Sequence, residues 1–221
     1  MKAFAIALLI VIAGASLLAP WVAPYGPDDI DMANRFAALS FAHPLGTDHL
    51  GRDELSRLLH GGRSTVLLAF AVTAATLLIG LVVGTISGYL GGWVDDAMQG
   101  IVLLFQGLPG LSFMLAIAGM LGPSLSSLFI AVVVTSWADF SRVVRAETIR
   151  IREETYIEAM RALGAGPGYI IANHVVPNLF APLVVLFTVR IGRVVLSIAA
   201  LSFLGLGLQP PAADWGVMIS D

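Results

Sequence analysis

Residues 156–178 read YIEAMRALGAGPGYIIANHVVPN, a polar, glycine-punctuated segment between two strongly apolar stretches. Apolar residues at helical spacing predict a helix over residues 147–163, and Gly164 follows where a glycine can take the left-handed conformation that ends a helix. Pro167 suits the first turn of a second helix, which we expect to end before Pro177 allows a change of direction. The segment therefore predicts a hairpin of two short helices. Such a hairpin either fills a groove on a partner protein or rests on lipid headgroups.

The composition predicts an integral membrane protein. Hydrophobic residues make up 57% of the 221 residues and charged residues only 12%, against roughly a quarter in soluble domains. The sequence contains no cysteine, which excludes disulfides and thiolate metal sites. Lys2 is the only lysine, so a Walker A loop is excluded, and any ATP hydrolysis must come from another subunit. The net charge of −3, without a basic stripe, argues against nucleic acid as a partner.

Long apolar blocks predict five membrane spans, each long enough to cross a bilayer. They cover Ala3–Ala23, Val66–Leu90, Ile101–Leu121, Leu128–Val144 and Leu179–Leu208. The first is either a signal anchor, which the spans that follow it favour, or a cleaved signal peptide. The segment between the first and second spans is polar, and we expect a solvated connection with short helices there.

Small residues mark two of these spans. Gly80, Gly84 and Gly88 recur every fourth residue, so they share one face of a helix and predict close approach of a neighbouring backbone. Pro109 interrupts the third span and frees a backbone carbonyl, which membranes tolerate only where protein or a wet cavity satisfies it. The interruption is either a structural kink or a pointer to a transport path.

Arginines predict the orientation of the chain in the membrane. The segment around the hairpin holds Arg142, Arg145, Arg150, Arg152 and Arg161. The positive-inside rule then places this segment, and with it the N-terminus, in the cytoplasm. The predicted organisation is a transmembrane anchor at 1–23, an extracytoplasmic segment at 24–63 and a transmembrane domain at 64–221 that carries a cytoplasmic loop at 145–178.

Three charged residues fall well inside predicted spans, away from the span ends. Arg190 and Arg193 lie within the fifth span, and Asp139 lies within the fourth. A charge at membrane depth is expensive and should face a polar cavity or an oppositely charged partner. We expect these residues to line a pathway or a subunit interface, with Arg190 paired to a carboxylate such as Asp139.

The hairpin resembles the EAA loop of ABC importer permeases, whose pattern is Glu-Ala-Ala, three residues, Gly, nine residues, Ile, one residue, Leu-Pro. This chain departs from that pattern at Met160, His174 and Val176, and a histidine at the second of these positions is typical of the peptide and nickel importer branch. In that family the loop forms coupling helices that sit in a groove of the ATPase subunit. The resemblance implies that role for Glu158, Ala159, Arg161, Gly164, Ala165, Gly166, His174 and Pro177.

Two further segments are similar to C-type permeases of the same branch. They are HPLGTDHLGRD at residues 43–53 and SFLGLGLQPPAADWGVM at residues 202–218. The resemblance implies an all-α, polytopic transmembrane bundle of the type I ABC importer permease fold, in the plasma (inner) membrane. It also implies a sixth span, so we expect the chain to be truncated after Asp221, the alternative being a five-span protein that lacks this helix.

The resemblance implies a set of partners as well. They are a homologous permease subunit in a heterodimer, two ATP-binding subunits and an extracytoplasmic substrate-binding protein. By the same resemblance, ATP and magnesium would be bound by the ATP-binding subunits, and no cofactor is expected in this chain. The cargo would be a peptide, nickel or another metal chelate, and the sequence does not choose among them. Histidines in the outer segment, His43 among them, belong to the family motif, and no metal site is expected there.

The rival hypothesis is an ion-coupled secondary transporter. Such a protein needs intramembrane acidic coupling sites, and Asp139 is the only carboxylate close to the interior of a span. An enzyme is a weaker hypothesis, because no nucleophile with a base and no pair of metal ligands falls within the spans.

Overall fold

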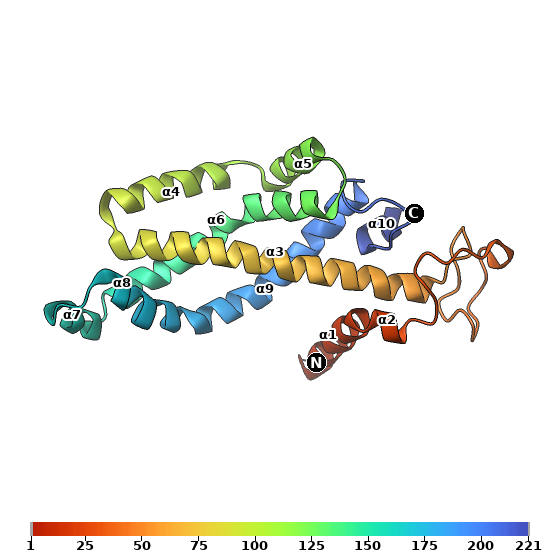
Figure 1. Cartoon of the computed structure of the whole chain (residues 1–221), viewed down its shortest axis with the longest axis horizontal. Coiled ribbons are helices and arrows are strands. Elements are labelled where there is room, and N and C mark those ends of the chain that lie inside the picture. Colours follow the sequence, from red (N-terminus) through yellow and green to blue (C-terminus); the bar gives the residue numbers. More distant parts are fainter. Residues whose placement is uncertain (1, 221) are drawn as a thin grey trace. The chain divides into compact units, whose positions relative to one another are not determined.

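The computed structural model describes residues 2–220, and every regular element in this range is a helix (Figure 1). In chain order they are α1 (Lys2–Leu17), α2 (Ala19–Val22), η1 (Met32–Asn34), α3 (Glu54–Leu90), α4 (Gly92–Gly107), α5 (Gly110–Leu121), α6 (Leu125–Arg152), α7 (Thr155–Ala162), α8 (Pro167–Ile170), η2 (Ile171–Val175), α9 (Val176–Phe203) and α10 (Trp215–Ser220). The chain forms two compact units. Unit 1 holds residues 1–70, 118–129 and 195–221, and unit 2 holds residues 71–117 and 130–194. The all-α fold class is confirmed.

Within residues 2–220, three helices are long and apolar enough to span a membrane, namely Glu54–Leu90, Leu125–Arg152 and Pro167–Phe203. The bent pair formed by α4 and α5 is a fourth candidate span, and Ile6–Leu17 is a shorter apolar helix. The spans predicted from Val66 and Leu128 begin earlier than expected, at Glu54 and Leu125. Polar residues occupy these extra turns, because parts of a helix beyond the hydrocarbon need not be apolar.

Glycines bring α3 and α6 together in unit 2. A Cβ added to Gly84 would lie 2.5 Å from the carbonyl oxygen of Ser141 in α6. The shortest equivalent distances to α6 are 2.4 Å at Gly80 and 2.8 Å at Gly88. Since side chains do not tolerate contacts this short, only glycine permits the observed separation of the two backbones. The predicted small-residue face is confirmed.

An ion pair at the same end of α3 joins α4 to α6. The Arg145 Nε donates to Asp95 Oδ1 at 2.6 Å, and a second guanidinium nitrogen donates to Asp95 Oδ2. The Ser87 hydroxyl also donates to Asp95, which lies in the first turn of α4. A bidentate pair of this kind fixes the orientation of α4 as well as its position.

The predicted interruption of the third span is a complete break. α4 ends at Gly107, α5 begins at Gly110, and the two helix axes differ by 86°. Leu108 between them has an extended backbone, with φ −84° and ψ 138°, as expected for a residue that precedes a proline.

Two buried arginines organise unit 1. The Arg52 Nε donates to Asp48 Oδ2 at 2.6 Å, while Arg57 donates to the carbonyl oxygens of Pro27 at 3.1 Å and Pro211 at 3.2 Å. Residues 28–45 are mostly exposed and contain the short helix η1, as expected for a solvated connection, but Arg52 and Arg57 are buried, which was not expected. These two arginines can be buried because carboxylate and carbonyl oxygens replace the water that they lose.

The same contacts explain why segments 43–53 and 202–218 both carry distinctive sequences. Asp214 accepts a hydrogen bond from the Thr65 hydroxyl at 3.1 Å and another from the backbone N–H of Gly216 at 2.9 Å. The Trp215 indole donates to the carbonyl oxygen of Leu58 at 3.0 Å. The Arg52 guanidinium of the first segment donates to the Pro211 carbonyl of the second at 3.5 Å, so both segments belong to one folded structure within unit 1.

Asp48 is the carboxylate at the centre of this network. Burial by itself would raise its pKa, but hydrogen bonds from the backbone N–H groups of Arg52 and Leu50, and from the Arg52 side chain, lower the pKa below its usual value. The folded state therefore keeps Asp48 ionised.

Candidate functional site

The first arm of the hairpin is shorter than predicted. The expected helix over residues 147–163 is wrong, because α6 ends at Arg152 and α7 begins at Thr155. Glu154 between them is extended, with φ −68° and ψ 138°. The resulting change of direction turns Ile157 toward the protein interior, where its side chain is fully buried. Burial of this side chain outweighs the helix propensity of the intervening residues.

α7 ends in a Schellman turn. Gly164 has φ +88°, its N–H donates to the Arg161 carbonyl at 3.0 Å, and the Ala165 N–H donates to the Met160 carbonyl at 3.0 Å. These two bonds satisfy carbonyls that the helix end would leave without partners. No atom lies within 4 Å of a Cβ built on Gly164, so the turn needs glycine for its conformation rather than for space. The predicted glycine turn is confirmed.

The second arm was predicted to end before Pro177, and this prediction is wrong. α8 continues through η2, a π-helical turn, into α9, so that a single helix runs from Pro167 to Phe203. In a regular α-helix the ring of Pro177 would clash with the carbonyl group of Asn173, four residues earlier. The wider π turn immediately before Pro177 relieves that clash and lets the helix continue.

An apolar cluster holds the hairpin against the membrane helices of unit 2. Its fully buried members from the hairpin and the π turn are Ile157, Ile170 and Val175. From the flanking helices the cluster receives Tyr89, Val144, Ile151, Leu179 and Leu183. Burying three large aliphatic side chains stabilises the hairpin by about 1.5–3 kcal/mol each, and this favours a rigid knob over a mobile loop.

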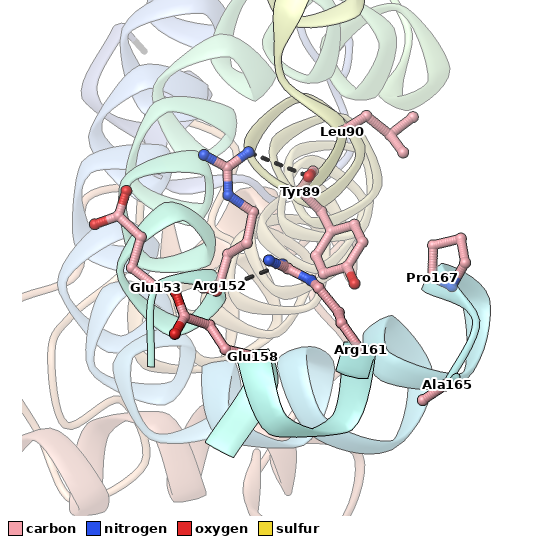
Figure 2. A pocket seen from close by; sticks show the side chains of 8 residues that line it. All are labelled: Tyr89, Leu90, Arg152, Glu153, Glu158, Arg161, Ala165 and Pro167. Carbon is pink, nitrogen blue, oxygen red and sulfur yellow. Dashed lines mark hydrogen bonds between the residues drawn. The ribbon is translucent and has the colours of Figure 1, made fainter. Parts of the chain in front are cut away.

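A polar cavity of about 530 Å³ opens between the hairpin and the end of α3 (Figure 2). Its lining consists of Tyr89, Leu90, Arg152, Glu153, Glu158, Arg161, Ala165 and Pro167. Arg152 donates to the Tyr89 carbonyl at 3.2 Å, which caps the C-terminus of α3. Arg161 donates to the Arg152 carbonyl at 3.4 Å and lies over the Tyr89 ring, 5.4 Å from its centroid. Two cations and two anions line the cavity, so it suits a polar partner surface of mixed charge.

The structure exposes most of the hairpin residues predicted from the sequence. Those exposed are Glu158, Ala159, Arg161, Gly164, Gly166 and Pro177, whereas Ala165 and His174 are half-buried. The His174 ring lies between two tyrosines, with centroids 6.2 Å from Tyr156 and 5.7 Å from Tyr169. Among the residues described, its Nε2 has no hydrogen-bond partner.

A second polar group lies within the membrane helices of unit 2. Arg190 donates to Asp139 Oδ2 at 2.6 Å, as the sequence predicted, and Gln106 donates to Asp139 Oδ1 at 3.1 Å. Arg142 donates to Gln106 Oε1 at 3.0 Å. Arg193 is exposed and does not line the cavity beside this group. The role of all these residues stays a prediction.

Sequence reasoning missed several residues of both sites. Nothing in the sequence indicates that Tyr89, at the end of α3, meets the hairpin, or that Arg152 caps that helix. Gln106 carried a weak signal, because a polar side chain beside the predicted interruption of a span is a candidate for a wet cavity. Arg142 was used in the sequence analysis only as one of the arginines that indicate the cytoplasmic side.

The helices and the exposed hairpin define a polytopic α-helical membrane protein with a polar knob between two of its spans. Residues 80–221 match the family described as the binding-protein-dependent transport system inner membrane component. The chain is 38% identical over 216 residues to the nickel transport system permease protein NikC of Escherichia coli K12, covering 98% of this chain and 77% of that protein. It is also 37% identical over 206 residues to the dipeptide transport system permease protein DppC of Alkalihalophilus pseudofirmus, covering 93% of this chain and 68% of the relative.

The chain belongs to the family of binding-protein-dependent transport system inner membrane components. The resemblance to ABC importer permeases of the peptide and nickel branch is thereby confirmed. The chain is a transport component of a membrane rather than an enzyme.

Proposed function

We propose that this chain is a permease subunit of an ATP-driven ABC importer that moves peptides or nickel or other metal chelates into the cell. The hairpin over residues 156–178 docks on an ATPase subunit in the cytoplasm and carries that subunit's movement into the spans. A homologous permease completes the pathway, two ATP-binding subunits supply the energy, and an extracytoplasmic binding protein delivers cargo. Nucleotide and loaded binding protein favour opposite states, and each shifts the equilibrium by its differential affinity.

The observation that carries this proposal is the combination of an exposed surface with a rigid base in one hairpin. Glu158 and Ala159 are exposed on α7, while Ile157 beside them is fully buried. Leu163 is a large apolar side chain that is 87% exposed at the tip. An apolar tip on a firmly held knob is typical of a surface that another protein covers.

The ion-coupled alternative has less support. Its only candidate coupling carboxylate, Asp139, accepts hydrogen bonds from Arg190 and Gln106. Both carboxylate oxygens of Asp139 thus have partners within the protein, and this leaves the site less open to a coupling ion.

Cross-linking tests the docking of the hairpin. The sequence contains no cysteine, so Ala159→Cys gives a single reactive thiol in this chain, within the complex purified through a tag on it. We expect a bifunctional reagent to join it to the ATPase subunit. The matched control is Ser126→Cys, an exposed residue in the first turn of α6 that the predicted topology places outside. A complex in which Ser126→Cys cross-links and Ala159→Cys does not would contradict the docking role.

Transport assays test the energy source. We expect the reconstituted complex to take up labelled dipeptide or nickel only with ATP and a binding protein. Uptake driven by an ion gradient in the absence of ATP would establish the secondary transporter instead.

A further inference from the structure

The helices of unit 2 border a second, open cavity, of about 410 Å³, beside the Asp139–Arg190 ion pair. Its polar lining consists of Gln106, two carboxylates, Asp139 and Glu147, and two guanidinium groups, Arg142 and Arg190, and Val143 is part of its wall. A cavity of this size is large enough for a small organic molecule. Charged residues within membrane helices are expensive, so a cluster of them facing a cavity indicates function before it indicates stability.

Not every charged side chain that lines this cavity has an oppositely charged partner. Asp139 is matched by Arg190, and Glu147 accepts a hydrogen bond from Arg150 at 2.9 Å. Arg142 has no carboxylate within ion-pairing distance in residues 2–220, and its single hydrogen bond there goes to the neutral amide oxygen of Gln106. One guanidinium therefore faces the cavity with its charge uncompensated and with donors to spare.

The cavity also lies at the break between α4 and α5. Gln106 belongs to the last turn of α4, and α5 leaves at 86° after Pro109. Non-helical backbone at membrane depth is tolerated where it is buried in protein or lines a water-filled cavity, so the break is consistent with a polar cavity at this place. The uncompensated arginine and the broken helix are independent observations that point to the same cavity.

We infer that this cavity is a subsite for a carboxylate group of the cargo, held between Arg142 and Arg190. Asp139 acts as an internal carboxylate that occupies Arg190 when cargo is absent and gives way when the cargo carboxylate arrives. A guanidinium binds a carboxylate through two parallel hydrogen bonds, which selects this group over a neutral amide. The inference rests on the proposed transport function, because it assigns part of the pathway to a chemical group of the cargo. The C-terminus of a peptide and the carboxylates of a metal chelator both carry that group.

Charge-selective labelling tests the subsite. Val143→Cys introduces one thiol on the wall of the cavity, where the valine is 40% exposed, and Ala146→Cys does the same one helical turn further along α6. Each variant, in the assembled complex in membrane vesicles, is treated with an anionic sulfonatoethyl or a cationic trimethylammonioethyl methanethiosulfonate. The rate of labelling by the anionic reagent is divided by the rate for the cationic reagent, and this ratio is normalised to the same ratio for a free thiol in solution. We expect the anionic reagent to be favoured roughly tenfold, from the attraction of a nearby screened unit charge.

Second-site changes assign the preference to particular residues. Arg142→Gln should bring the ratio close to one, while Arg142→Lys, which keeps the charge, should retain most of it. Asp139→Asn should raise the ratio, because it removes the internal competitor for Arg190. A purely structural role for the cluster predicts none of these three shifts.

Protection identifies the chemical group and its source. Glycylglycine at millimolar concentration should slow labelling several-fold, whereas glycylglycine amide should not. Protection by citrate but not by glycylglycine would assign the subsite to chelator carboxylates rather than to peptides. Labelling with no charge preference, or with a preference that Arg142→Gln leaves unchanged, would refute the carboxylate subsite. It would not contradict the proposed transport function. A thiol that neither reagent reaches at either position overturns both, because the cavity would then be closed to water.

Discussion

Replacing Gly84 by alanine should loosen the packing of α3 on α6 by an amount that follows from the structure. The added Cβ would lie 2.5 Å from the Ser141 carbonyl oxygen and 2.9 Å from the Arg145 backbone nitrogen. Both are backbone atoms, so neither can rotate away as a flexible side chain would. Ordinary contact begins near 3.4 Å, and α6 must therefore retreat by about 1 Å.

A separation of about 1 Å has a definite cost. It forfeits between a quarter and a half of the attraction of each atom pair across the contact, where each pair is worth about 0.1–0.2 kcal/mol. For roughly 30 pairs along a helix contact the loss is about 2 kcal/mol, within the range of overpacking substitutions in protein cores. This corresponds to roughly a 30-fold shift in the unfolding equilibrium.

Gly192→Ala is the matched control. Gly192 also lies in the interior of a membrane helix, but a Cβ there meets no atom within 4 Å. Both variants gain the same helix propensity of about 1 kcal/mol, so the difference between them isolates the steric term. Unfolding by titration with sodium dodecyl sulfate in mixed micelles, followed by tryptophan fluorescence, measures that difference. Equal midpoints for the two variants would refute the close-approach argument.

Three further predictions concern the glycine turn after α7, the hydrogen bonds of Asp48 in unit 1 and the α4–α6 ion pair. Gly164→Ala should cost about 1–2 kcal/mol by forcing alanine into a left-handed conformation, and should reduce ATP-dependent uptake, whereas Gly166→Ala, with φ −72°, should do neither. Asp48→Asn should lower the free energy of unfolding by about 1.5–3 kcal/mol at neutral pH. Because the folded pKa of Asp48 is lowered, its stabilisation is complete above the unfolded pKa of about 3.9 and is lost as the pH falls through the folded pKa. The difference in unfolding midpoint between wild type and Asp48→Asn should therefore shrink on acidification, and a difference that persists at low pH would contradict this. A double-mutant cycle of Arg145→Gln with Asp95→Asn should give a coupling energy of about 1–3 kcal/mol in the same titration. Additive changes in the free energy of unfolding would show that this ion pair does not stabilise the protein.

Local patterns in the sequence predicted the features that depend on local chemistry. The spacing of Gly80, Gly84 and Gly88 indicated a packing face, Pro109 indicated the interruption, and Gly164 indicated the turn. Each of these follows from what one residue type does to its own backbone or to one helical face. Sequence reasoning therefore needed no knowledge of the partner helix to find them.

Features that depend on distant contacts were out of reach. The burial of Arg57 depends on the carbonyl oxygen of Pro211, which lies 154 residues away in the sequence. The break at Glu154 depends on where the buried side chain of Ile157 finds its apolar neighbours. Continuation of the helix through Pro177 depends on a π turn, for which helical periodicity gives no signal. In each case tertiary contacts overrode a correct local preference.

The contacts of the hairpin determine where a force applied to it is transmitted. Arg161 on α7 touches both the Tyr89 ring of α3 and the Arg152 carbonyl at the end of α6, and Ala165 after the turn packs on the same apolar cluster. The second arm is continuous with α9, since the helix from Pro167 to Phe203 is unbroken. A displacement of α7 therefore acts on the adjoining ends of α3, α6 and α9 at the same time. The π turn lies within this path, and its weaker hydrogen-bond geometry makes it the segment most able to absorb a change in the angle between hairpin and span. Coupling through a rigid knob with one compliant turn predicts that substitutions in η2 alter transport more than they alter the binding of the partner.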